Sequence, residues 1–291
     1  MHSLISTLRE AGHTVSVVLP NTQRSWIGKA HIVGQTLTPS YFRPGTLHKD
    51  DGIVQDQPFH DGGEEWILLD GTPASCTQIG VAHLFNDQKP IDLVLSGPNY
   101  GRNTTAVFAL SSGTLGAAME GATLGKKSIA LSYAFDSREH DPEIIAAASK
   151  VSTRLVEKLM KEWPEDVHVY SINVPLKKGV ENQLITYAEM IQNKWTSGST
   201  FTVLPENTSN ADPDAEEVKI RGNNGSVDTV EKSARREHVT FKWAPQFADV
   251  KAASEAAGKG DGWHVLQGHI TVTPLRANFW HLPHYTGEIK L

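Results

Sequence analysis

Short apolar runs alternate with amphipathic stretches along the first 175 residues. The runs that read as strands span residues 13–19, 66–69, 91–96, 128–132 and 168–174. The stretches with helical periodicity span residues 4–11, 74–85, 114–124 and 141–163. Strands that are apolar throughout and alternate with helices are typical of a parallel sheet covered on both faces. The pattern predicts an α/β fold for residues 1–175.

The pattern of apolar and polar residues changes after Pro175. Strand-like pieces without long helices follow, at residues 184–190, 199–204, 239–243 and 264–275. Between them, residues 205–238 are rich in Asn, Asp, Gly and charged side chains and have few apolar ones, so they cannot bury a core of their own. We therefore expect a smaller β-rich unit over residues 176–291, with an exposed polar insertion at about 205–238.

The segment 91–125 carries the clearest chemical signal. Its apolar run ends at residues 96–99, Ser-Gly-Pro-Asn, and a helix opens on Ser111, Ser112, Gly113 and Thr114. Open α/β sheets bind ligands at the carboxyl ends of their strands, and the N-terminus of a helix favours an anion. The segment thus suits a phosphate or a carboxylate. A glycine-bearing loop followed by an ordinary helix cap is the competing interpretation, and this segment alone does not decide between them.

Six blocks of sequence, spread from about residue 4 to 275, resemble the SurE family of survival-protein phosphatases and nucleotidases, in particular its fungal branch. The blocks are residues 23–28 (QRSWIG), 71–76 (GTPASC), 96–101 (SGPNYG), 112–121 (SGT…AAMEG), 171–175 (SINVP) and 268–275 (GHITVTPL). The resemblance implies a Rossmann-like parallel sheet in residues 1–175. It also implies a β-rich arm in residues 176–291 that embraces a second subunit, giving a homodimer or a dimer of dimers.

One block of the family pattern has no counterpart here. In the family, the chain opens with an apolar strand ending in Asn-Asp-Asp-Gly, whose aspartates hold a divalent metal ion. This sequence begins with residues that resemble the helix after that strand, and Asp50-Asp51-Gly52 follows no buried strand and reads as a solvated turn. Because the absent strand would be central, we expect the strands 13–19 and 91–96 to flank a gap.

The resemblance assigns roles to nine residues. It makes Ser25 and Asn99 metal ligands, since neutral oxygen atoms suit Mg²⁺ or Mn²⁺. The substrate-binding positions are Gly97, Asn103, Ser111, Ser112, Gly113, Thr114 and Thr72. The ordinary alternatives are a loop serine, a turn-capping asparagine, helix caps and hydrogen bonds that stabilise loops.

The implied reaction is metal-dependent hydrolysis of a phosphomonoester, with nucleoside monophosphates as the substrate class. Without the acidic pair, the attraction for a divalent ion falls, so we expect little activity from these 291 residues. The main alternative is a non-catalytic homologue that binds a phosphorylated ligand or a partner chain. A third is a module joined to a ligase-like domain, as in some fungal relatives, although the end of the sequence shortly after Leu275 argues against it.

Composition narrows the class further. The net charge of −6 argues against a surface that coats nucleic acid. The sequence contains no apolar run of 18 or more residues, so it predicts no membrane-spanning helix. The single cysteine, Cys76, cannot form an internal disulfide and is expected to be buried and structural. The first residues resemble neither a signal peptide nor a transit peptide, so we expect a cytoplasmic location.

Overall fold

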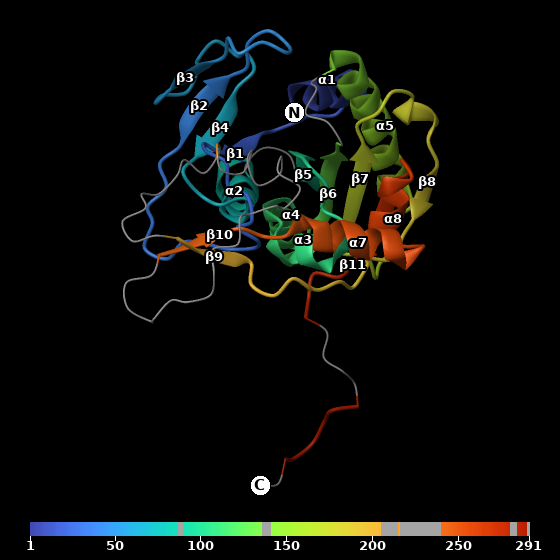
Figure 1. The fold of residues 1–291 in the computed structure, drawn as a ribbon. Helices are drawn as coiled ribbons and strands as arrows, with labels where there is room; N and C mark the ends of the chain where they lie inside the picture. The colour runs from blue at the N-terminus through green and yellow to red at the C-terminus, as the bar shows by residue number, and fades with distance from the viewer. Residues whose placement is uncertain (87–89, 136–140, 205–214, 216–239, 280–283, 290–291) are drawn as a thin grey trace.

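A computed structural model describes residues 1–86, 90–135, 141–204, 215, 240–279 and 284–289 (Figure 1). The first half of the chain contains α1 (His2–Glu10), β1 (Val18–Pro20), β2 (Ser40–Arg43), β3 (Ile53–Gln55), β4 (Trp66–Leu69), α2 (Pro73–Ile79) with a π-helical turn (Gly80–Leu84), β5 (Leu93–Tyr100), α3 (Thr105–Ser111), α4 (Gly113–Thr123) and β6 (Lys127–Ala134). The second half contains α5 (Pro142–Lys161), β7 (Val169–Pro175), a 3₁₀ turn (Val180–Asn182), β8 (Ile185–Tyr187), β9 (Phe201–Leu204), β10 (Thr240–Trp243), α7 (Phe247–Ala257), α8 (Asp261–Leu266) and β11 (Ile270–Leu275).

The central sheet has five strands in the order β5-β6-β7-β11-β8. Strands β5, β6 and β7 are parallel, β11 runs antiparallel to β7, and β8 runs parallel to β11. One face packs against α1 and α5 in the main core, and α4 covers the other face at Ala130 and Val169. The predicted α/β fold, with helices on both faces of a mainly parallel sheet, is confirmed.

A second sheet has the order β1-β4-β2-β3, with β1 parallel to β4 and a β2–β3 hairpin added antiparallel. The sequence pattern did not predict this hairpin. Asp51 lies in its turn, is exposed, and accepts hydrogen bonds from the backbone N–H and the hydroxyl of Thr46 at 2.6 and 2.7 Å. The Asp50-Asp51-Gly52 segment is therefore a solvated turn, as expected.

Each of the two sheets ends in a strand that has no further neighbour among the described strands. Strand β1 is the outer strand of one sheet and β5 of the other, and the two are not hydrogen-bonded to each other, as predicted. All eight residues of β5 are half-buried although three of the first four positions are apolar, whereas every residue of β7 is buried. Interior strands of such a sheet are normally covered on both sides. Strand β5 thus has the apolar sequence of a central strand, although it lies at the edge of its sheet.

The helices hold the two sheets together across these edges. On one side, α1 places Leu4 and Leu8 in the core of the central sheet and Ile5 against Val17 and Trp66 of the second sheet. On the other side, α2 packs along α4. Figure 1 shows β1 and β5 between these helix layers.

Several elements differ from the predicted ones. Strand β5 continues through Gly97 and Asn99, which were expected to form a loop, with a bulge between Ser96 and Asn99. Helix α3 was not expected, nor were α7 and α8, and the last strand begins at Ile270 instead of 264. Strands β8 and β11 follow the predicted domain boundary at residue 175, yet they belong to the central sheet together with β5, β6 and β7.

The predicted insertion at 205–238 lies outside the described residues except for position 215. Within the described part of the chain, none of the helices is both long and apolar enough to cross a membrane.

Candidate functional site

Asn99 lies at the carboxyl end of β5, where the strand bulges. In the register with β6 it stands beside Ser132, and its amide nitrogen donates to the carbonyl oxygen of Gly101 at 3.0 Å. The bulge depends on Gly97, whose φ of 122° disfavours a side chain and whose Cβ, if added, would lie 2.2 Å from the carbonyl oxygen of Leu131. Because the amide nitrogen is used as a donor, the amide oxygen of Asn99 is the atom that remains to bind a cation.

The serine loop, residues 23–28, follows β1 and rests on the start of α4. The backbone N–H of Gly28 donates to the carbonyl oxygen of Ser111 at 2.9 Å. Behind it, a Cβ on Gly116 would lie 2.4 Å from the carbonyl oxygen of Gly28, so only glycine permits this approach. Ser25 itself is exposed, and its hydroxyl accepts a hydrogen bond from the side-chain amide of Gln23 at 2.7 Å.

An ion pair fixes the loop from its other end. The ammonium group of Lys29 lies 2.6 Å from the carboxylate of Glu120 on α4, and the ring of His31 lies 3.4 Å from the same carboxylate. Glu120 is buried, so pairing offsets much of its desolvation cost. No role was predicted for Glu120, although its position in the AAMEG block, residues 117–121, is a signal that could have identified it.

The start of α4 carries four predicted substrate-binding positions. Ser112 caps the helix, since its hydroxyl accepts from the backbone N–H of Leu115 at 3.0 Å. The hydroxyl of Ser111 turns back and donates to the carbonyl oxygen of Val107 at 3.0 Å. Gly113 is the first helical residue and Thr114 is half-buried. Capping, the competing interpretation, is thus present: it satisfies the backbone N–H of Leu115, whereas those of Gly113 and Thr114 have no carbonyl partner within the helix. Phosphate binding by these four residues stays a prediction.

Thr72 and Asn103 are buried and hydrogen-bonded within the protein. Thr72 caps α2 by accepting from the backbone N–H of Ser75 at 3.0 Å, and its hydroxyl also donates to the carbonyl oxygen of Ala30. The backbone N–H of Asn103 donates to the side chain of Asn173 at 2.8 Å, and its amide nitrogen donates to the hydroxyl of Ser132 at 2.8 Å. These contacts hold the loops at the sheet edge, and a substrate contact for either residue stays a prediction.

The charges near the serine loop do not complete a metal centre. The carboxylate of Asp70, directly after β4, is paired with Arg24 of the loop. Within the described residues, no group of three or more His, Cys, Asp or Glu side chains is placed to hold a metal ion. Asn99 and Ser25 supply two neutral oxygen atoms, whereas Mg²⁺ sites use carboxylates to offset the charge of the ion. By themselves these residues do not fit a divalent cation.

Helix α3 is held by a buried carboxylate far away in the sequence. Asp261, 1% exposed, accepts from the backbone N–H of Thr105 at 2.9 Å and of Ile191 at 3.1 Å. Burial raises the pKa of Asp261 from 3.8, and the N–H donors oppose that rise. Thr105 has a φ of 70°, an uncommon conformation for a β-branched residue. Asp261 therefore anchors the segment between β5 and α4.

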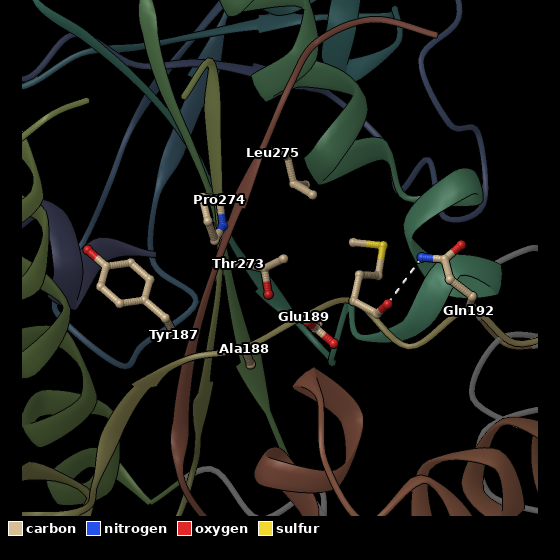
Figure 2. A pocket seen from close by; sticks show the side chains of 8 residues that line it. Tyr187, Ala188, Glu189, Gln192, Thr273, Pro274 and Leu275 are labelled. Atoms are coloured by element: carbon tan, nitrogen blue, oxygen red, sulfur yellow. Dashed lines mark hydrogen bonds between the residues drawn. The ribbon is translucent and has the colours of Figure 1, made fainter. Parts of the chain in front are cut away.

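The described surface contains hollows, of which one adjoins the serine loop. A cavity of about 550 Å³ adjoins the serine loop and is lined by residues that share an aromatic or apolar character, with one serine and one lysine: Trp26, Val107, Leu110, Ser111, Lys194, Trp195 and Trp243. A second one, of about 390 Å³, lies beside β8 and β11 (Figure 2), where Gln192 donates to the carbonyl oxygen of Met190 at 3.1 Å. The second holds none of the predicted site residues.

Comparisons with known proteins agree with this arrangement. The family model described as "Survival protein SurE" matches residues 1–197. The crystal structure of the SurE protein from Aquifex aeolicus superposes with a TM-score of 0.58 at 25% identity, covering 95% of this chain and 89% of that one. The chain therefore belongs to the SurE family, and its fold is that of the family.

Relatives with two different names are similar to this chain. A probable tubulin–tyrosine ligase, PBY1 of Saccharomyces cerevisiae, is 34% identical over 95% of this chain and 38% of its own length. A 5'-nucleotidase SurE of Nostoc is 34% identical over 60% of this chain and 58% of its own length. A 5'-nucleotidase SurE of Ruegeria pomeroyi is 34% identical over 74% of this chain and 72% of its own length. The chain spans only about 38% to 58% of the first two relatives.

Proposed function

We propose that this chain forms the core of a metal-dependent phosphomonoester hydrolase that acts on nucleoside monophosphates. The observation that carries the proposal is the joining of the serine loop to the start of α4 by the Gly28–Ser111 hydrogen bond and the Gly116 contact. This places two separate sequence blocks at one edge of the sheet. The relatives named 5'-nucleotidase SurE support the substrate class.

Within this proposal, the chain's own residues bind the phosphate. The first turn of α4 offers backbone N–H groups and the positive end of the helix dipole, and Thr114 adds a hydroxyl donor. A Cβ at Gly113 would lie 3.1 Å from the side chains of both Ile27 and Pro73, so glycine lets the serine loop and α2 pack closely against the helix start. Ser111, Ser112, Gly97, Asn103 and Thr72 shape the surrounding loops, either touching substrate or holding those that do.

We further propose that Ser25 and Asn99 help to hold Mg²⁺ or Mn²⁺, together with carboxylates from a strand that lies between β1 and β5. Among the described residues, β1 and β5 each have one edge without a neighbouring strand, and apolar Leu93, Val94 and Leu95 are only half-buried. Both observations support the insertion of a strand there. A carboxylate pair at its end would supply the negative charge that the described residues lack.

The alternative is a non-catalytic homologue that binds a phosphorylated ligand or a partner chain. The absence of a metal-ligating cluster among the described residues favours it. A homodimer or dimer of dimers is part of either version, and light scattering after size-exclusion chromatography measures it directly.

Manganese binding tests the proposed metal centre without relying on turnover. Electron paramagnetic resonance should detect weak or no Mn²⁺ binding by the 291-residue chain and tight binding once an N-terminal strand ending in an acidic pair is added. In the extended chain, Asn99→Ala should weaken Mn²⁺ binding by about tenfold, roughly 1.4 kcal/mol. Unchanged affinity of the Asn99→Ala variant would remove Asn99 from the site.

A further inference from the structure

We propose that the cavity beside the serine loop is a binding site for a flat aromatic ring, and that Trp195 and Trp243 make the protein select phosphomonoesters that carry such a ring. The base of a nucleoside monophosphate is a ring of this kind. The inference rests on the proposed function for its phosphate end, because Ser111, which lines the cavity, is the first of the four residues at the start of α4 that are expected to bind phosphate.

Three tryptophans form the aromatic wall of the cavity. The ring centroid of Trp26 lies 6.4 Å from that of Trp195 and 4.7 Å from that of Trp243. All three side chains are half-buried, so part of each ring surface remains accessible. Aromatic side chains bring large apolar area and can stack on a planar ligand, and the cavity of about 550 Å³ falls within the range of small-molecule sites.

The wall is fixed from behind. Trp26 stacks on Phe247 at 5.6 Å with an angle of 10° between the rings, and meets Phe108 edge-on at 5.5 Å. Neither phenylalanine belongs to the lining of the cavity. Trp26 has a φ of 63°, which is unusual for a bulky residue, and such strained conformations gather at ligand sites. The packing therefore holds a strained tryptophan with one side toward the cavity.

The segment that carries Trp195 is also anchored. Before it, the backbone N–H of Val107 donates to the side chain of Asn193 at 3.0 Å, which ties the segment to α3. After it, the backbone N–H groups of Thr196 and Ser197 each donate to Asp249 of α7 at 2.8 Å. Such preorganisation lowers the entropic cost of binding a ligand.

The lining is also suited to an anionic ligand. Lys194, an exposed residue, belongs to the lining of the cavity together with Ser111 and the three tryptophans. A cation together with aromatic faces matches a molecule with a planar ring and a phosphate, and it disfavours a purely apolar occupant.

Isothermal titration calorimetry tests the inference with three probes: a nucleoside monophosphate, the matching uncharged nucleoside, and ribose 5-phosphate. We expect Trp195→Leu and Trp243→Leu to weaken binding of the nucleoside and of the nucleoside monophosphate by about tenfold or more, and to leave ribose 5-phosphate unchanged. Trp263→Leu is the matched control, because Trp263 is a half-buried tryptophan of α8 outside the cavity lining.

Nucleoside binding that is equal in the wild type and both cavity variants would overturn the inference, as would a failure of the nucleoside to bind at all. An equal loss for ribose 5-phosphate would assign the tryptophans a structural role and also overturn it. If no phosphate is released from any nucleotide but tryptophan-dependent nucleoside binding is measured, the proposed hydrolysis fails and the aromatic site stands.

Discussion

The backbone N–H of Gly28 donates to the carbonyl oxygen of Ser111 at 2.9 Å, although the two residues lie 83 positions apart in the sequence. The bond joins the loop after β1 to the junction of α3 and α4. It brings a predicted metal ligand, Ser25, and a predicted phosphate-binding turn to the same edge of the molecule. The candidate site is thus formed where the loop after β1 contacts the α3–α4 junction.

Gly116→Ala tests how tightly this contact is packed. A Cβ at position 116 would lie 2.4 Å from the carbonyl oxygen of Gly28, and backbone cannot yield as a flexible side chain can. We expect a loss of about 1–3 kcal/mol in the free energy of unfolding, measured by urea denaturation. Lys150→Ala, at an exposed position of α5, serves as the control. A Gly116→Ala variant as stable as the wild type would show that the loop does not rest on α4.

Asp261→Asn should destabilise the protein by about 1–3 kcal/mol, because an amide has a single acceptor oxygen and its NH2 group must then face the backbone N–H of either Thr105 or Ile191. Asp92→Asn, at an exposed position, is the control and should be close to neutral. Denaturation in urea near pH 7 gives the comparison. Equal stability of the two variants contradicts the anchoring role of Asp261.

The same residue gives a pH dependence with a defined sign. Burial raises the pKa of Asp261 above 3.8, so the folded state binds this proton more tightly than the unfolded state. Its contribution to stability is therefore present below about pH 3.8 and declines as the pH rises through the folded pKa. We expect the stability advantage of the wild type over Asp261→Asn to shrink over that interval. An advantage that grows with pH there would show that the folded pKa is lowered.

Cys76 should be unreactive in the folded protein. It is 3% exposed, and burial raises the pKa of its thiol to about 12, although the charge of Arg24 opposes the rise. At pH 8 the thiol is therefore protonated and shielded, and alkylation by iodoacetamide should be slow until urea unfolds the chain. Rapid modification of the native protein would mean that the site is open. The measurement also counts thiols, since the chain has one cysteine.

Amide hydrogen exchange reports on the edge of β5. Among the strands that the structure describes, β5 pairs with β6 alone, whereas β6 is paired on both sides. We expect the β5 amides that face away from β6 to exchange rapidly and those of β6 to exchange slowly. In a chain extended by an N-terminal strand, the rapid β5 amides should become protected. Uniformly slow exchange along β5 in the 291-residue chain would contradict an open edge.

Local sequence patterns predicted the helices and strands whose ends are marked by nearby residues. Strand β4 and helix α4 were expected within a residue or two of their bounds, because an apolar run and a serine cap mark them. Helix α7 was missed although its alanine-rich sequence favours a helix and Gly258 ends it in the left-handed conformation. Helix α7 could therefore have been predicted from the sequence.

Other features depend on contacts that the sequence pattern does not encode. Helix α3 is only seven residues long, and its first N–H is bound by Asp261, 156 positions away. The aromatic cavity gathers Trp26, Trp195 and Trp243 from three separate segments. The family motifs located Ser25, Asn99 and the start of α4, whereas the residues that hold them together became visible only in three dimensions.

Release of inorganic phosphate from nucleoside monophosphates is the most direct measurement of the proposed function. It compares the 291-residue chain with one extended by a strand that ends in an acidic pair, with Mg²⁺ or Mn²⁺ and with a chelator. The account predicts low turnover by the first chain, chelator-sensitive turnover by the second, and a loss of about tenfold or more with Asn99→Ala. Strong chelator-insensitive turnover by the 291-residue chain would contradict the metal mechanism, and an inactive extended chain that still binds nucleotide would favour the binding homologue.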